Sequence, residues 1–268
     1  MDINALKKKL NQLQTSTSIK DNLWKPKPGQ NQIRIVPYSH NKDNPFIELF
    51  FHYDIGNRSY LSPMSFGRPD PIEEFAEKLK GSGNRDDWKL GRKLDAKMRT
   101  FVPVIERGKE REGVKFWGFG KTVYQELLSF IADPDYGDIA DAVTGRDITV
   151  DFKTAEETGR SYPTTTLRVK PNQTPLTEDK DLLESLLTNQ TDITELYTEK
   201  TYDELSEVLQ NWLNPKDGES PDGNTTTENP SMSDVKTATT EKTEKQTTTA
   251  TTTTAENVGD AFDDLFGE

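Results

Sequence analysis

Residues 88–121, which read WKLGRKLDAKMRTFVPVIERGKEREGVKFWGFGK, decide the fold of this chain. The stretch carries ten Lys or Arg side chains against four Asp or Glu, although the formal net charge of the whole chain is −12. Positive charge is therefore concentrated in one part of an acidic chain. Two segments within it, 97–105 and 114–121, alternate in polarity and predict two strands, because successive side chains of a strand point to opposite faces.

Each predicted strand has an apolar face and a face that mixes cations with aromatic rings. In the first strand the mixed face holds Lys97, Arg99 and Phe101, and in the second it holds Lys115, Trp117, Phe119 and Lys121. Cations can contact phosphates and flat rings can stack on bases, so such a surface suits a single nucleic-acid strand. The predicted DNA-contacting residues are Arg92, Lys93, Lys97, Arg99, Phe101, Arg111, Lys115, Trp117, Phe119, Lys121 and Tyr162.

The charge is distributed unevenly along the sequence. Residues 1–132 have a balance of +7, residues 133–212 of −11, and residues 213–268 of −8. A basic front and an acidic back predict a binding site for a polyanion and a tail that competes for it. A hydrophobic content of 31% is low, which indicates that part of the chain does not fold.

Composition also excludes several classes of site. The chain has no cysteine, which rules out disulfides, zinc–thiolate sites and Cys nucleophiles. No apolar run approaches the roughly 20 residues of a membrane span, and Lys7, Lys8 and Lys9 interrupt the N-terminus where a signal peptide would be apolar. The sequence therefore predicts a soluble, intracellular protein without membrane contact and without a cofactor.

The remaining segments predict an α+β, mainly β fold: a small OB-fold-like antiparallel barrel with helical additions. Strands are predicted at 32–38, 46–55, 57–61, 146–153 and 164–170, and the second and third of these form a hairpin through Gly56-Asn57. Helices are predicted at 71–80, 122–132, 177–189 and 201–213. A polar loop with a further helical turn is predicted before residue 97. Trp24 is predicted to anchor the linker that precedes the first strand.

The two ends of the chain predict separate segments. Residues 1–20 form a basic arm with Lys7, Lys8 and Lys9, residues 21–213 the binding core, and residues 214–255 a disordered Thr-rich linker. Residues 256–268 mix carboxylates with apolar side chains, which is typical of a peptide that docks on a partner. The predicted docking residues are Asp260, Phe262, Asp263, Asp264, Leu265 and Phe266.

Three motifs resemble catalytic or metal sites but do not complete them. Gly120-Lys121-Thr122 ends like a phosphate loop, but Lys115 stands where GxxxxGK[ST] needs its first glycine. Asp133–Asp138 begins like a calcium loop, but Thr144 stands where the bidentate Glu should be. His40 and His52 are not near a nucleophile in the sequence. Two alternatives stay open: a nuclease with scattered carboxylate metal ligands, and an adaptor that docks proteins through its tail.

The order of these parts resembles the single-stranded DNA-binding, helix-destabilising proteins of T-even-type bacteriophages. The resemblance covers residues 1–213 in outline and the acidic tip, and three segments carry it together with the terminal Asp263-Asp264-Leu265-Phe266. These segments are Leu23–Lys27 followed by Ile33–Pro37, Lys97–Phe101, and Lys115–Lys121.

This resemblance implies an OB-fold core and a protein that coats single-stranded DNA, without sequence preference, in phage replication, recombination and repair. It implies that Lys7, Lys8 and Lys9 support cooperative binding of neighbouring copies, and that the acidic tip recruits replication and recombination proteins such as polymerase, helicase loader and recombinase mediator. The implied location is the cytoplasm of the infected bacterial host. Known members hold zinc through three Cys and one His, but the corresponding residues 62–75, SPMSFGRPDPIEEF, lack cysteine. We therefore do not expect zinc in this chain.

Overall fold

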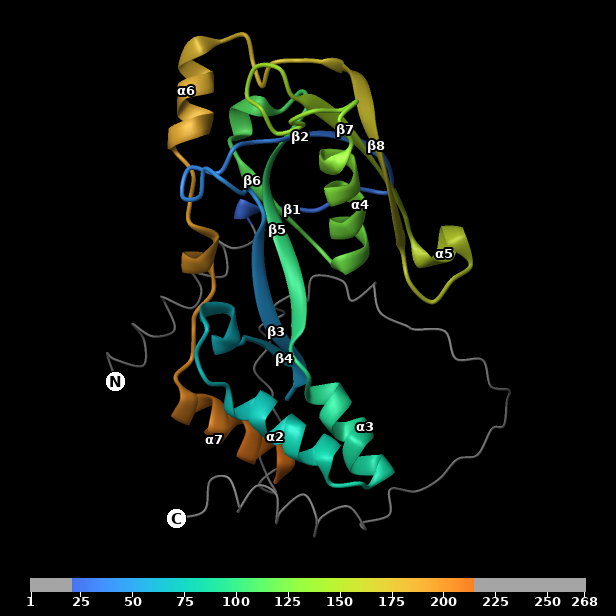
Figure 1. Cartoon of the computed structure of the whole chain (residues 1–268), viewed down its shortest axis with the longest axis vertical. Coiled ribbons are helices and arrows are strands. Elements are labelled where there is room, and N and C mark those ends of the chain that lie inside the picture. Colours follow the sequence, from blue (N-terminus) through green and yellow to red (C-terminus); the bar gives the residue numbers. More distant parts are fainter. Residues whose placement is uncertain (1–20, 215–268) are drawn as a thin grey trace, which may run out of the picture. The chain divides into compact units, whose positions relative to one another are not determined.

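The structure is a computed structural model that describes residues 21–214 (Figure 1). These residues divide into two compact units. Unit 1 contains residues 21–49 and 98–198, and unit 2 contains residues 50–97 and 199–214. The predicted arm with Lys7, Lys8 and Lys9, the linker and the docking tip lie outside the described residues, so these three assignments stay predictions.

Within residues 21–214 the strands form a mixed sheet of eight strands. They are β1 (Leu23–Trp24), β2 (Gly29–Ile35), β3 (Ile47–Ile55), β4 (Arg58–Leu61), β5 (Lys97–Glu106), β6 (Lys115–Phe119), β7 (Arg146–Lys153) and β8 (Thr164–Gln173). Six of them are paired in the order β1-β6-β5-β2-β7-β8. The β1–β6 pair is parallel, whereas β6–β5, β5–β2, β2–β7 and β7–β8 are antiparallel.

The helices mostly follow or separate strands. They are α2 (Pro71–Gly81), α3 (Arg85–Leu94), α4 (Lys121–Ala132), α5 (Ala155–Thr158), α6 (Lys180–Thr188) and α7 (Tyr202–Leu213), with short 3₁₀ turns η1 (Pro63–Phe66), η2 (Glu110–Glu112) and η3 (Ile193–Leu196). None of the helices within residues 21–214 combines the length and the apolar character that crossing a membrane requires.

The predicted α+β class is confirmed, and most predicted elements lie within a few residues of their expected bounds. The β3–β4 hairpin turns at Gly56 and Asn57, whose φ angles of 60° and 57° are those of the predicted tight turn. The pairing within residues 21–214 does not establish the closed five-stranded barrel. α3 is longer than the single turn that we predicted, and α5 was not predicted at all.

The core of unit 1 lies between its strands and α4. Val123 and Leu127 of α4 pack with inward residues of the sheet, among them Ile33, Val104 and Val150. Figure 1 shows α4 beside β7 and β8. Trp24 is buried and donates from its indole Nε1 to Glu106 Oε2 at 3.1 Å, which confirms that it anchors the segment before β2.

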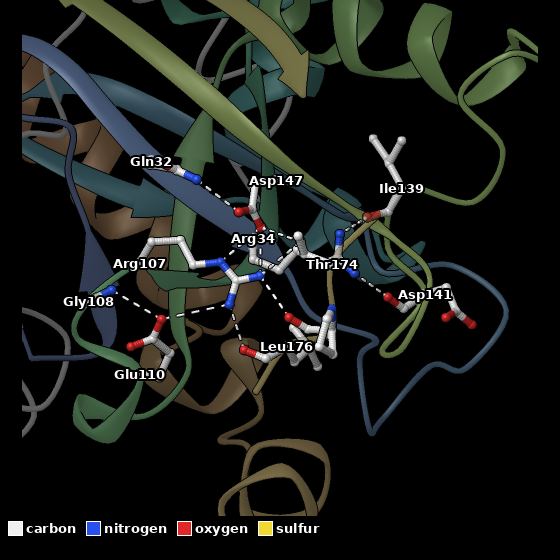
Figure 2. Close-up of polar contacts among 11 residues, drawn as sticks. Gln32, Arg34, Arg107, Gly108, Glu110, Ile139, Asp141, Asp147, Thr174 and Leu176 are labelled. Atoms are coloured by element: carbon white, nitrogen blue, oxygen red, sulfur yellow. Dashed lines mark hydrogen bonds and ion pairs between the residues drawn. The ribbon is translucent and has the colours of Figure 1, made fainter. Parts of the chain in front are cut away.

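Two arginines tie loops of unit 1 to its sheet (Figure 2). Arg107 donates to Asp147 Oδ1 at 2.6 Å from Nη2 and at 2.8 Å from Nε. Arg34 is fully buried and donates to the carbonyl oxygens of Ile139 at 3.2 Å and Asp141 at 2.5 Å. Burial lowers the pKa of Arg34 to about 10, so the guanidinium is still charged at neutral pH. Its contacts hold the loop between α4 and β7 in one conformation.

In unit 2, α2 packs against α3 and α7 around Phe75 and Leu79. The start of α2 follows the sequence closely, with Pro71 in its first turn. Asp70 caps this helix, because its Oδ1 accepts from the backbone N–H groups of Ile72 at 2.9 Å and Glu73 at 3.3 Å.

A buried polar network joins α2 to the hairpin and to the end of α3. His52 Nε2 lies 2.9 Å from Asp70 Oδ2, and its Nδ1 lies 2.7 Å from the carbonyl oxygen of Leu94. Ser62 Oγ donates to the same carboxylate oxygen of Asp70. Residues 62–75 thus form η1 and the beginning of α2. Within the network the His52 imidazole is hydrogen-bonded to the Asp70 carboxylate. This donor set does not fit the zinc site that the family resemblance implies.

Asp70 should stabilise the fold at neutral pH and lose this effect in acid. Burial alone would raise the pKa of Asp70, but the hydrogen bond and charge of His52, with the hydrogen bond from Ser62, outweigh burial and lower it below 3.8. The stabilisation is therefore complete above pH 3.8 and is lost as the pH falls through the lower, folded-state value. Asp70→Asn should reduce the free energy of unfolding by on the order of 3 kcal/mol at neutral pH.

Urea unfolding at a series of pH values measures this effect, with the exposed Glu77→Gln on the same helix as the control. The gap between Asp70→Asn and the unsubstituted chain should shrink in acid. A gap that is absent at neutral pH would show that the network does not stabilise the chain.

Candidate nucleic-acid interface

The register of β5 against β6 decides which side chains share a face. Phe101 lies opposite Gly118, and Val102 lies opposite Trp117. Since directly opposed residues of an antiparallel pair point to the same side, Trp117 shares a face with Val102, whereas Phe101 points to the other side. The predicted single surface that combines both strands is therefore wrong. The alternation within each strand is right, but the two mixed faces point in opposite directions.

The predicted rings are also less exposed than a solvent-facing surface requires. Phe101 and Trp117 are each 2% exposed, and Phe119 is 4% exposed. Trp117 lies edge-on to Trp24, with ring centroids 5.5 Å apart, and its centroid lies 4.7 Å from that of Phe119. The Phe101 ring packs beside Tyr197, at 5.8 Å. The expectation that these rings stand open to solvent is wrong, because the sheet has packed partners on both faces.

The rings nevertheless border an open hollow in unit 1. The hollow has a volume of about 160 Å³ and lies next to the short strand β1, whose pairing with β6 ends at Trp24 and Trp117. Beyond that point it is lined by Gly118 and Phe119 of β6 and by Gly120, which follows the strand. The hollow is lined by Leu23, Trp24, Lys25, Pro26, Arg99, Phe101, Trp117, Gly118, Phe119, Gly120, Val123, Phe152 and Thr165.

The hollow combines aromatic walls with two cations, Lys25 and Arg99. Arg99 Nη2 donates to the carbonyl oxygen of Gly118 at 2.9 Å, which holds the guanidinium against β6. Within the described part of the chain, Arg99 Nε is buried and has no hydrogen-bond partner. The Arg99 side chain as a whole is only partly buried and lines the hollow, so the remainder of its guanidinium can receive an acceptor from a ligand.

Gly118 allows this arrangement. A Cβ atom built there would lie 2.7 Å from Cε1 and 3.1 Å from Cδ1 of the Phe101 ring, closer than real contacts allow. The absence of a side chain lets the ring lie directly against the β6 backbone. Phe101 consequently lines the hollow although it points to the face opposite Trp117.

The other predicted cations lie elsewhere, and several have acidic neighbours. In unit 1, Lys115 pairs with Glu112 at 2.6 Å, and Arg111 lies 3.5 Å from Asp179. Lys121 is exposed at the start of α4, and Tyr162 is half-buried before β8. None of these four lines the hollow.

Three predicted cations belong to unit 2. Arg92 pairs with Asp95 at 2.8 Å, and Lys93 Nζ lies 5.8 Å from the centroid of the Trp212 ring. Lys97 Nζ donates to the carbonyl oxygen of Arg92 at 3.3 Å, and burial lowers the pKa of Lys97.

Several lining residues were not among the predicted site residues, and three of them carry an aromatic ring or a charge. Lys25 and the ring of Trp24 reach the hollow because β1 pairs in parallel with β6, which no local pattern predicts. Phe152 appears in the sequence as an ordinary apolar position of a strand. The one usable signal was the adjacent pair Trp24-Lys25, which combines a ring with a cation in a polar segment.

Comparison with known proteins identifies a family. A family model described as "gp32 DNA binding protein like" matches residues 27–214, which is more than half of the chain. No curated protein matches the chain at a significant level.

The packing of Phe101 on Gly118 can be tested by substitution. Gly118→Ala should lower the free energy of unfolding by roughly 1–3 kcal/mol, because the added methyl group displaces the Phe101 ring. Gly81→Ala is the matched control, since a Cβ there meets nothing within 4 Å. Urea unfolding of both variants measures the difference. Equal stability of the two would contradict the described contact.

Proposed function

From the premise that the chain belongs to the gp32-like family of DNA-binding proteins, we propose that it binds single-stranded DNA through the hollow of unit 1. This family is not an enzyme class. Binding does not depend strongly on base sequence, because the hollow offers rings and cations, and every base has a face that can stack on a ring. In this proposal the sheet of unit 1 serves as an OB-fold-like platform.

The observation that carries the proposal is the meeting of Arg99 and Lys25 with five aromatic side chains at one open site. These side chains are Trp24, Phe101, Trp117, Phe119 and Phe152. The Arg99 guanidinium contacts a phosphate, and Lys25 adds positive charge beside it. A base enters at the open side of the hollow and contacts the edges of the rings.

A single strand fits this site better than a duplex. In a duplex the faces of the bases are stacked on each other, so only their edges reach a protein. Aromatic contacts of the kind that the hollow offers require unstacked bases. Because phosphate contacts release counterions, the affinity falls with salt concentration.

The sequence supports two further parts of the proposal. The arm with Lys7, Lys8 and Lys9 links neighbouring copies along DNA, and the tip with Phe262, Leu265 and Phe266 docks replication and recombination proteins. Both parts rest on charge pattern and on family resemblance. Lys115, Lys121 and Tyr162 are retained as outer contacts for a strand that leaves the hollow, and their distance from it makes their effect smaller than that of Arg99.

Removing the Arg99 charge should weaken DNA binding. Arg99→Gln should raise the dissociation constant for an oligothymidylate by roughly tenfold, since it removes a charge-assisted hydrogen bond. It should also make the slope of log K against log salt shallower by about 1. Fluorescence anisotropy with a labelled oligonucleotide measures both quantities.

The control is Lys42→Gln, which replaces an exposed lysine of the same unit that does not line the hollow. Similar losses from both variants would mean that binding follows overall charge rather than the hollow.

Deleting residues 1–14 should separate affinity from cooperativity. Affinity for an oligonucleotide that fits one copy should change little, because the hollow is intact, whereas cooperative coating of a long strand should be lost. Titrations with one short and one long homopolymer give the comparison. An equal loss on both lengths would refute the arm's role.

A further inference from the structure

The outward side of α3, in unit 2, is a second place where cations surround an aromatic ring. Arg85, Trp88, Lys89 and Arg92 recur at helical spacing and are all exposed. Trp88 is 50% exposed. The opposite side of the same helix is buried through Asp87, Gly91 and Leu94. The helix therefore buries one side and presents a basic side with a tryptophan at its centre.

This helix is held firmly, so the exposure of Trp88 is not the result of loose packing. A Cβ atom at Gly91 would lie 2.6 Å from the carbonyl oxygen of Ala76, which shows how closely α3 approaches α2. The buried Asp87 accepts a hydrogen bond from Ser82 Oγ at 2.9 Å. The Asn84 side chain caps the helix by accepting from the Asp86 N–H at 2.9 Å.

The cations on this side are crowded and only weakly compensated. Arg85 and Lys89, and likewise Lys89 and Lys93, stand four residues apart, where like charges repel each other. Lys89 pairs with Asp86 at 2.7 Å and Arg92 with Asp95 at 2.8 Å. Lys89 and Asp86 are both more than half exposed, and exposed pairs of this kind are weak. An incoming polyanion can therefore replace Asp86 as the partner of Lys89, whereas Arg92 stays paired with Asp95, whose side chain is only 10% exposed.

The aromatic ring and the cations are also in contact. The Arg92 guanidinium carbon lies 5.8 Å from the centroid of the Trp88 ring, a cation–π distance. A lone exposed tryptophan needs no explanation, but a tryptophan among three cations offers both of the groups that a nucleotide needs: a flat surface for the base and positive charge for its phosphates.

We propose that the outward side of α3 is a second contact for single-stranded DNA, in which Trp88 stacks on a base and Arg85 and Lys89 contact the flanking phosphates. The proposal rests on the proposed function and deepens it, because it adds to the hollow of unit 1 a contact on unit 2. It also gives a role to Arg92, which positions the Trp88 ring and adds charge beside it.

The experiment compares Trp88→Ala and Trp88→Phe with the intact full-length chain. Trp88→Ala should raise the dissociation constant for an oligothymidylate of ~16 nucleotides roughly 5- to 150-fold, which corresponds to the loss of one stacked base. Trp88→Phe keeps a flat ring and should retain most of the affinity. Lys89→Gln should make the salt slope shallower by about 1. Thermal unfolding checks that each variant folds as the intact chain does.

Phe66→Ala is the matched control. Phe66 is 37% exposed in the same unit and has the Arg68 guanidinium 5.1 Å from its ring centroid, but that arginine pairs with Glu199 at 2.6 Å. This variant should bind DNA as the intact chain does. An equal loss from Phe66→Ala and Trp88→Ala would contradict a specific contact at α3.

The remaining outcomes separate this proposal from the proposed function. If the intact chain binds DNA and Trp88→Ala binds equally well, the contact at α3 is refuted and the hollow still stands. If Trp88→Ala binds DNA more tightly, the α3 side instead holds an acidic peptide such as residues 256–268, which also refutes the proposal. If the intact chain shows no salt-dependent binding, the proposed function itself fails.

Discussion

The packing of the Phe101 ring on the bare backbone of Gly118 is the contact on which the candidate site depends. It requires β5 and β6 to pair in the register that sets these two residues opposite each other. The same register places Trp117 on the other side of the pair, beside Trp24. Rings from both faces then border the edge of β6 where β1 ends, and Arg99 is held there by its hydrogen bond to the Gly118 carbonyl. A shift by one residue would exchange the faces of one strand and remove the hollow.

This dependence explains what the sequence could and could not predict. Local patterns suffice for β7 and for the capping box that starts α7, because alternation and caps are properties of neighbouring residues. They suffice for α2, which begins with Pro71 and ends at Gly81. Local patterns do not predict the β5–β6 register or the parallel pairing of β1 with β6, because packing between distant segments sets both. The predicted site residues are therefore divided: Arg99, Phe101, Trp117 and Phe119 line the hollow, whereas Lys115, Arg111 and Lys121 do not.

The two units use different means to keep polar groups inside. Unit 1 buries Arg34, whose Nη1 and Nη2 donate to backbone carbonyl oxygens, and it pairs Arg107 with Asp147. Unit 2 joins His52, Ser62 and Asp70 in one network. Buried charges are tolerated when they are paired or hydrogen-bonded. In unit 1 these interactions fix the loop between α4 and β7, and in unit 2 they fix the start of α2, against which α3 with Trp88 packs.

The central claim is that unpaired bases enter a hollow bordered by two of the four tryptophans, Trp24 and Trp117. The most direct measurement is the intrinsic tryptophan fluorescence of the intact chain during titration with oligothymidylate and, separately, with a duplex of equal length, over a series of salt concentrations. The account predicts strong quenching by the single strand that weakens steeply with salt, and little quenching by the duplex. Equal quenching by both, or none by the single strand at low salt, would contradict it.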